Sequence, residues 1–183
     1  LALARRWHDA GNTVIVTGRN ADRLAAATIG RPNMHAVSLD VTDPDAITAF
    51  AVAVVARFPS LNVLVNNAGI MNAEDASAKR NLAQAEATVV TNILGPIRLT
   101  DALVDHLAAQ ADSAIVNVTS GLAFVPFPKA PTYSATKAAM HSYSVALRIQ
   151  LAGKVEVIEL APPAVRTDLT PGQSTREGYM PLD

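Results

Sequence analysis

The sequence predicts an α/β protein with a doubly wound parallel sheet that carries helices on both faces. Short apolar or β-branched segments alternate with helical segments along all 183 residues, an order typical of parallel strands joined by helices. Residues 62–66 have a wholly apolar centre, Val-Leu-Val, as expected for a strand that is covered on both faces. Several strand-like segments also end in polar residues, and ligands of such folds bind at the carboxyl ends of the strands.

The elements expected from this pattern follow one another in regular order. The expected strands are residues 13–18, 34–39, 62–66, 114–119 and 155–161. The expected helices are residues 1–10, 21–27, 44–58, 83–110 and 132–151, and a loop is expected from residue 162 onward. Asp43 and Pro44 supply an N-cap and a first helical residue for the third helix. The fourth helix should be irregular near Gly95 and Pro96.

The composition excludes several classes of function. Half of the residues are apolar, which is enough for one domain, residues 1–183, with a substantial core. A net charge of −1 without long charged runs offers no electrostatic surface to nucleic acid or membranes, and no apolar stretch could span a bilayer. The absence of cysteine excludes disulfides and thiolate metal sites, and it fits a reducing compartment such as the cytoplasm. No cluster of His, Asp and Glu suggests a metal site.

Polar residues follow the first three predicted strands. Arg19 could pair with a phosphate through its planar fork, which in a dinucleotide-binding fold favours NADP over NAD; a solvated arginine at a turn is an equal alternative. Asp40 could accept a hydrogen bond from an adenine amino group, although capping of the next turn is the simpler interpretation. Residues 66–69, Asn-Asn-Ala-Gly, let the backbone approach a flat ligand closely, or they form an ordinary Asn/Gly turn.

Ser120, Tyr133 and Lys137 form the most informative group in the sequence. Ser120 follows the fourth strand, and Tyr133 and Lys137 are four residues apart, on one face of a helix. A nearby ammonium lowers the pKa of a phenol, which can then pass a proton to or from a carbonyl or alcohol oxygen. The pair alone arises by chance in roughly 7% of chains of this composition. Ser120 lacks the Gly-x-Ser-x-Gly elbow of a hydrolase, and the four histidines are expected to be surface or packing residues.

In their order and spacing, these motifs resemble those of the short-chain dehydrogenase/reductase family over almost the whole chain. Residues 66–69 match the motif of the family's fourth strand, and Asn92 matches a helical asparagine. Ser120, Tyr133 and Lys137 match the catalytic serine, tyrosine and lysine. The resemblance implies a Rossmann-like NAD(P)-binding domain.

A second stretch of similarity lies near the end of the chain. Residues 161–167 resemble the segment that closes over the nicotinamide, in which Val165 matches a backbone contact to the carboxamide and Thr167 a nearby hydroxyl. Residues 120–131, together with Pro162 and Pro163, are most similar to a subgroup of DltE-like oxidoreductases.

The resemblance implies an NAD(P)-dependent oxidoreductase that moves a hydride between a nicotinamide cofactor and a carbonyl or secondary alcohol. NADP is favoured and NAD is possible. The implied catalytic residues are Asn92, Ser120, Tyr133 and Lys137. The candidate cofactor-binding residues are Arg19, Asp40, Val41, Asn67, Ala68, Gly69, Tyr133, Lys137, Pro162, Val165 and Thr167.

The family pattern assigns a role to each catalytic residue. Lys137 would bind the nicotinamide ribose and lower the pKa of Tyr133, and Tyr133 would act as general acid in reduction and general base in oxidation. Ser120 would hydrogen-bond the substrate oxygen, where charge develops. Asn92 would anchor a water of the proton relay.

The substrate and the assembly are indicated more weakly. The apolar residues Leu122, Phe124, Val125 and Phe127 and a mobile lid at residues 171–180 suggest a partly apolar carbonyl or alcohol; the alternative is that these residues simply pack beneath the lid. The helices that bear Asn92 and Tyr133 carry small and apolar residues, and family members commonly pair through them. A homodimer or homotetramer is therefore expected, with packing inside one chain as the alternative.

The sequence departs from the family pattern in two places. Pro163 stands where most members have glycine, which removes an N–H from the local cofactor contacts. The printed sequence also lacks the family's first strand with its Gly-rich phosphate loop, and its last strand, so we expect the natural chain to be longer.

Two alternative functions stay open: a non-catalytic dinucleotide-binding protein, and an epimerase or dehydratase that uses the same tyrosine–lysine pair.

Overall fold

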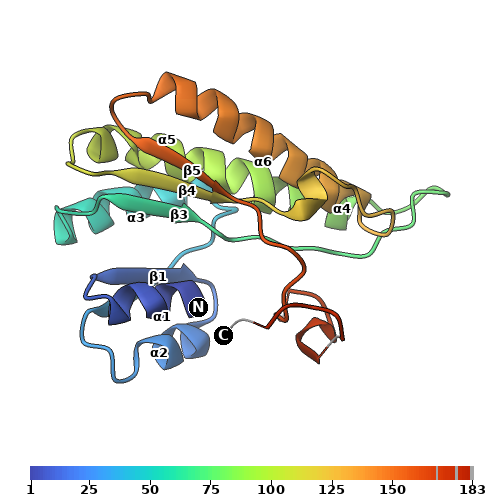
Figure 1. The fold of residues 1–183 in the computed structure, drawn as a ribbon, viewed down its shortest axis with the longest axis horizontal. Coiled ribbons are helices and arrows are strands. Elements are labelled where there is room, and N and C mark those ends of the chain that lie inside the picture. The colour runs from blue at the N-terminus through green and yellow to red at the C-terminus, as the bar shows by residue number, and fades with distance from the viewer. Residues whose placement is uncertain (168, 176, 182–183) are drawn as a thin grey trace. The chain divides into compact units, whose positions relative to one another are not determined.

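The computed structural model of the chain describes residues 1–167, 169–175 and 177–181 (Figure 1). Parallel strands alternate with helices, which confirms the predicted α/β class. Contacts define two compact units, residues 1–40 and residues 41–181, a division that the sequence pattern did not indicate.

The first unit is a small β-α-β arrangement preceded by a helix. It contains α1 (Ala2–Asp9), β1 (Val14–Gly18), α2 (Ala21–Thr28) and β2 (Met34–Ser38). β1 and β2 pair in parallel, with Val14 opposite Met34 at the start. The Asn20 side chain accepts a hydrogen bond from the Arg23 amide at 2.8 Å and so caps α2.

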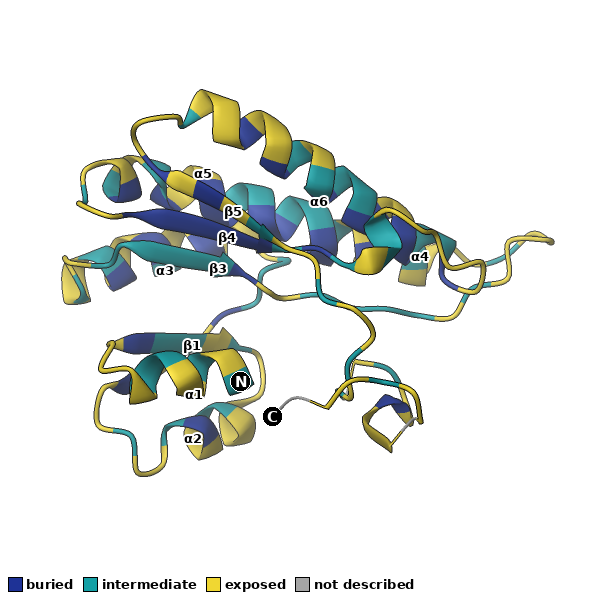
Figure 2. Cartoon of the chain, viewed as in Figure 1, coloured by how far each residue is buried: buried dark blue, intermediate teal, exposed yellow. Residues whose placement is uncertain are grey.

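The second unit is built on three parallel strands. Its elements are α3 (Pro44–Arg57), β3 (Val63–Asn66), α4 (Ala83–Val89), η1 (Val90–Leu94), α5 (Gly95–Ala108), β4 (Ala114–Val118), η2 (Gly121–Ala123), α6 (Pro131–Gln150), β5 (Glu156–Leu160) and η3 (Gln173–Thr175). β4 lies between β3 and β5 and is the most deeply buried of the three (Figure 2). α5 packs against β3 and β4, and α6 packs against β5. The five predicted strands are all present, with ends that differ from the predicted ones by at most one residue.

The start of α3 follows the predicted capping pattern. One carboxylate oxygen of Asp43 accepts hydrogen bonds from the amides of Asp45 and Ala46, at 2.9 and 3.0 Å, and Pro44 occupies the first turn. A carboxylate in this place satisfies amides that have no partner within the helix. The cap thus fixes where α3 begins.

The helix expected over residues 83–110 is interrupted, as its Gly-Pro pair predicted. α4 and α5 are joined by η1, a π-helical turn, so the region is three segments. Gly95 begins α5, where an added Cβ would lie 3.0 Å from the Val41 carbonyl oxygen. Only glycine fits this contact without a shift of the backbone. The irregular turn also carries Asn92, which belongs to the site described below.

A row of buried polar side chains crosses the second unit and has no signature in the sequence. Asn66 Nδ2 donates to Asn117 Oδ1 at 2.9 Å and to Thr100 Oγ1 at 3.2 Å. Asn117 Nδ2 donates in turn to Ser144 Oγ at 2.9 Å. The row therefore ties β3, β4, α5 and α6 together through bonds that water cannot replace.

Replacement of Asn117 by leucine should lower the free energy of unfolding by about 1–3 kcal/mol. The change removes the acceptor of Asn66 and the donor to Ser144 in a site that solvent does not reach. Asn62→Leu is a matched control, because the Asn62 amide makes a bond to the Asp112 carbonyl that lies at the surface. Urea unfolding of both variants measures the difference. Equal losses of unfolding free energy in the two variants would show that the buried row contributes no more to stability than a hydrogen bond at the surface.

Across the part of the chain that the structure describes, no helix is both long and apolar enough to cross a membrane. Within the same residues, no group of three or more His, Asp or Glu side chains could hold a metal ion.

Candidate active site

The fold brings Ser120, Tyr133 and Lys137 together in the second unit, as the sequence predicted. Ser120 lies just beyond the carboxyl end of β4, and its hydroxyl shares a hydrogen bond with the Tyr133 phenol. Tyr133 lies in the first turn of α6, and Lys137 follows it by one turn, with Nζ 5.6 Å from the centroid of the phenol ring. Tyr133 and Lys137 are both buried. The end of β4 and one face of α6 thus bring these three side chains together as a candidate acid–base centre.

Burial dominates the electrostatics of this centre. Burial raises the pKa of Tyr133, and the hydrogen bond with Ser120 opposes that rise only in part. Burial also lowers the pKa of Lys137 to about 8. The sequence predicted a lowered pKa for the phenol, and that prediction was wrong for this structure, because the effect of burial on the pKa of Tyr133 outweighs that of the hydrogen bond with Ser120.

Lys137 is held by a backbone carbonyl and lies beside a glycine. Nζ donates to the Val118 carbonyl at 2.7 Å, which uses one of its three N–H groups. Gly69 lies beside it, because a Cβ added there would be 3.8 Å from Nζ and 3.4 Å from Asn92 Oδ1. A side chain at position 69 would fill the space next to the ammonium. The loop that follows β3 therefore passes close to the ammonium at Gly69.

Asn92 has a structural role that the sequence did not reveal. Its Oδ1 accepts from the Ile70 amide at 2.9 Å, and its Nδ2 donates to the Ile70 carbonyl at 2.9 Å and to Thr136 Oγ1 at 3.2 Å. The side chain therefore clamps the loop after β3 to α6, on the side where Tyr133 and Lys137 lie. A π-helical turn in this position is common at functional sites.

The other candidate cofactor residues of the second unit lie in loops. Asn67 and Ala68 are exposed after β3, and Val41 contacts Gly95. The Pro162 carbonyl accepts the Gly121 amide at 3.1 Å, which links the segment after β5 to the segment after Ser120. These residues are thus arranged around the ends of β3, β4 and β5.

The segment predicted as a lid folds back on residues 164–167. Met180 pairs with Val165 in a short parallel bridge, and buried Gln173 donates from Nε2 to the Val165 carbonyl at 2.9 Å and to Thr167 Oγ1 at 3.0 Å. Residue 176 of the predicted lid lies outside the described residues. The contacts of Gln173 hold together the two residues expected to approach the nicotinamide.

Arg19 and Asp40 belong to the first unit. Their charged groups are 3.8 Å apart, and the Arg19 side chain is 69% exposed. An exposed pair at this distance contributes little to stability. The guanidinium is therefore accessible to a ligand.

Two acidic side chains near the centre were missed by the sequence reasoning. Glu159 of β5 accepts from the Thr119 hydroxyl at 2.7 Å and pairs with His141 Nδ1 at 2.8 Å, so His141 is more than a surface or packing residue. The Phe124 ring lies edge-on to His141, with centroids 4.8 Å apart. Glu74 contacts the first turn of α6. No sequence signal could identify these partners, since 40 residues separate Thr119 from Glu159 and 58 separate Glu74 from Thr132.

Comparison with known proteins gives consistent results over nearly the whole chain. The family described as short chain dehydrogenase matches residues 1–178. A protein named uncharacterized oxidoreductase DltE, from Bacillus subtilis (strain 168), is 43% identical over 180 residues, which are 97% of this chain and 71% of that protein.

Solved structures show the same similarity in three dimensions. The closed form of a serine dehydrogenase complexed with NADP+ matches with a TM-score of 0.84 and 29% identity, over 90% of this chain and 67% of that one. A 3-ketoacyl-(acyl-carrier-protein) reductase from Brucella melitensis complexed with NADH matches with a TM-score of 0.86 and 28% identity, over 92% and 71%. The Rossmann-like fold predicted from the sequence is thereby confirmed.

Proposed function

Because the chain belongs to the short-chain dehydrogenase family and is thus an NAD(P)-dependent oxidoreductase, we propose that Ser120, Tyr133 and Lys137 transfer its protons. The reaction is hydride transfer between NADP and a carbonyl or secondary alcohol. The observation that carries the proposal is the meeting of the Tyr133 phenol with Ser120 at the edge of β4, one helical turn from Lys137. Three groups suited to one chemistry thus converge from two segments, the end of β4 and the first turns of α6.

The residues at the centre fit a nicotinamide cofactor. Lys137 has two N–H groups beyond the one given to Val118, and bare Gly69 leaves room beside its ammonium for a ribose. Val165 and Thr167, held by Gln173, would contact the carboxamide. The cofactor supplies the hydride when it is bound.

The proton chemistry belongs to the chain. In reduction, the Tyr133 hydroxyl gives its proton to the carbonyl oxygen of the substrate, and Ser120 hydrogen-bonds the same oxygen as it gains charge. The raised pKa of Tyr133 keeps the phenol protonated at neutral pH, which suits the general-acid role. In oxidation the proton returns to the phenolate. Asn92 keeps the loop at Ile70 against α6 while this occurs.

NADP is the proposed cofactor because Arg19 offers an accessible guanidinium after β1. Arg19→Ala should weaken binding of NADPH by roughly 10- to 100-fold, since a charge-assisted bond to the 2′-phosphate is lost. Binding of NADH should change little. Fluorescence titration gives the dissociation constants of NADPH and NADH, and hence their ratio, for the unaltered protein and for Arg19→Ala. Arg23→Ala on α2 is the control. An unchanged ratio would assign Arg19 to the solvated surface.

The substrate is proposed to be a small, partly apolar carbonyl or alcohol. Phe124 and Val125, which follow Ser120, are 57% and 72% exposed and offer an apolar contact surface. Relatives act on substrates as different as serine and a 3-ketoacyl group, by their names. A panel of aldehydes, ketones and hydroxy acids, followed through NADPH absorbance, tests the class. Conversion of a substrate without net oxidation of NADPH would instead favour an epimerase or dehydratase.

A homodimer or homotetramer is proposed for the assembly. Val145 and Ile149 on α6 are 41% and 75% exposed, and such apolar side chains can be covered by a second copy. Light scattering of the purified protein gives the mass of the assembly, and a monomeric mass would reject the proposal.

A further inference from the structure

The N-terminus of α6 lacks a cap from its own neighbourhood. Ala130 occupies the N-cap position and has no side chain that could accept an amide. Pro131 has no N–H, so Thr132 carries the first amide that needs a partner. That partner is the Glu74 carboxylate, which lies 58 residues earlier in the chain.

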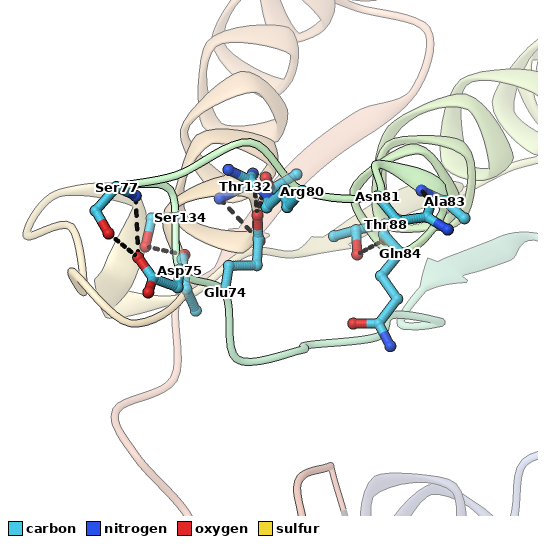
Figure 3. A network of polar contacts seen from close by, with 11 residues as sticks. Glu74, Asp75, Ser77, Arg80, Asn81, Ala83, Gln84, Thr88, Thr132 and Ser134 are labelled. Carbon is cyan, nitrogen blue, oxygen red and sulfur yellow. Dashed lines mark hydrogen bonds and ion pairs between the residues drawn. The ribbon is translucent and has the colours of Figure 1, made fainter.

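Glu74 binds both polar groups of Thr132 (Figure 3). Oε1 accepts from the Thr132 amide at 3.2 Å, and Oε2 accepts from the Thr132 hydroxyl at 2.7 Å. Arg80 Nη2 donates to Oε2 at 2.7 Å, and the Glu74 amide donates to the Lys129 carbonyl at 2.9 Å. The Glu74 side chain is only 6% exposed. The carboxylate is therefore desolvated but fully bonded.

The charge and place of this carboxylate suit the end of a helix. A negative group at a helix N-terminus is favoured by the partial positive charge of the free amides, and Arg80 balances the charge that remains. The arrangement differs from an ordinary local cap, because it joins α6 to the loop between β3 and α4. Asn92 fastens the same loop at Ile70.

Polar bonds hold this loop where packing does not. Residues 67–82 contain no helix or strand, and residues 73–75, 80–81 and 83–85 line a cavity of about 530 Å³. Side chains next to an open cavity can shift, since few atoms oppose the movement. The position of the first turn of α6 relative to this loop thus depends on Glu74.

We propose that Glu74 is a positioning residue that sets the first turn of α6, and with it the phenol of Tyr133, for proton transfer. Tyr133 is the residue directly after Thr132, so a rotation of that turn moves the phenol away from Ser120. This inference rests on the proposed role of Tyr133. Small misplacements of a reacting group lower turnover strongly, whereas binding of the cofactor depends on other residues.

Steady-state kinetics of Glu74→Gln and Thr132→Val test the proposal, on the carbonyl compound that the panel identifies. Glu74→Gln should lower kcat by roughly 10- to 100-fold with KM for NADPH within about twofold. Thr132→Val, which keeps the Glu74–Arg80 pair, should lower kcat less, and Thr132→Ser should restore it because the hydroxyl and amide remain. Thr132→Val also serves if the Glu74 variant fails to fold.

Asp75→Asn is the matched control, since Asp75 is an exposed acid of the same loop that bonds only to Ser77 among the described residues. Its kcat should equal that of the unaltered protein. An unchanged kcat in Glu74→Gln and Thr132→Val, with only a lower melting temperature, would reduce Glu74 to a stabilising contact. Tyr133→Phe is measured alongside: if it stays active, the proposed function fails, whereas an inactive Tyr133→Phe beside active Glu74 variants rejects this inference alone.

Amide hydrogen exchange tests the same proposal without a substrate. In Glu74→Gln, exchange of residues 132–135 should accelerate by roughly tenfold or more, while residues 141–150 of the same helix keep their rates. Acceleration along the whole of α6 would indicate general destabilisation and contradict a local positioning role. Unchanged exchange at residues 132–135 would contradict it as well.

Discussion

Tyr133→Phe is expected to lower kcat by roughly 10²- to 10⁴-fold, the range lost when a positioned general acid is removed. The phenylalanine keeps the ring within the first turn of α6 but has no proton to give to the substrate oxygen. Binding of NADPH should be nearly unchanged, because Lys137, Gly69 and the loop residues are left in place. Stopped-flow or steady-state absorbance gives kcat, and fluorescence titration gives the binding constant.

Tyr143→Phe is the control for this change. Tyr143 lies on α6 as well, is partly buried, and its hydroxyl bonds to Thr100 rather than to Ser120. Its loss should leave turnover close to that of the unaltered protein. If Tyr133→Phe kept comparable turnover, the proton would have to come from another group and the assignment of the centre would be wrong.

The strands could be predicted because their signals are local. Residues 63–65 and 114–116 are apolar runs bounded by polar residues, and all five predicted strands appear within one residue of their expected ends. The start of α3 could be predicted for the same reason, since Asp43 and Pro44 are adjacent in sequence. Each of these features depends on residues a few positions apart.

The break in the long helix could be predicted from the local sequence, but its cause could not. Gly95 and Pro96 indicated that residues 83–110 would be irregular, and η1 lies directly before them. The contact of Gly95 with Val41, where an added Cβ would lie only 3.0 Å from the Val41 carbonyl oxygen, joins positions that are far apart in sequence. The sequence therefore shows that a helix is disturbed, and the packing shows why.

The candidate site, too, could be predicted only in part from the sequence. The spacing of Tyr133 and Lys137 predicted that they share one face of a helix, and the structure places them so. The direction of the Tyr133 pKa could not be predicted, because it depends on how deeply the whole fold buries the phenol. The bonds of Glu74 to Thr132 and of Glu159 to Thr119 join distant segments and leave no periodic trace. The contacts between distant segments around the candidate site were therefore less visible in the sequence than the candidate catalytic residues themselves.

Lys137→Met is expected to abolish most turnover and, at neutral pH, to make the protein more stable. The pKa of Lys137 falls from 10.5 to about 8 on folding, because burial disfavours the ammonium. That difference corresponds to about 3 kcal/mol against the folded state below pH 8. The lost bond to the Val118 carbonyl offsets about 1 kcal/mol of the gain. A net stabilisation of about 1–3 kcal/mol at pH 7 follows.

The pH dependence of this difference provides the sharper measurement. Between pH 8 and 10.5 the unfolded chain binds a proton at Lys137 that the folded chain does not, so the unaltered protein gains stability as pH rises. Lys137→Met has no such group, and its advantage in urea unfolding should shrink from pH 7 to pH 10 and then vanish. Lys154→Met, at an exposed lysine, should show no such trend. If Lys137→Met were less stable at pH 7, the ammonium would be a favourable part of the core. If it is more stable, the fold retains a destabilising charge, as expected of a residue whose proposed use lies in binding the cofactor and in proton transfer.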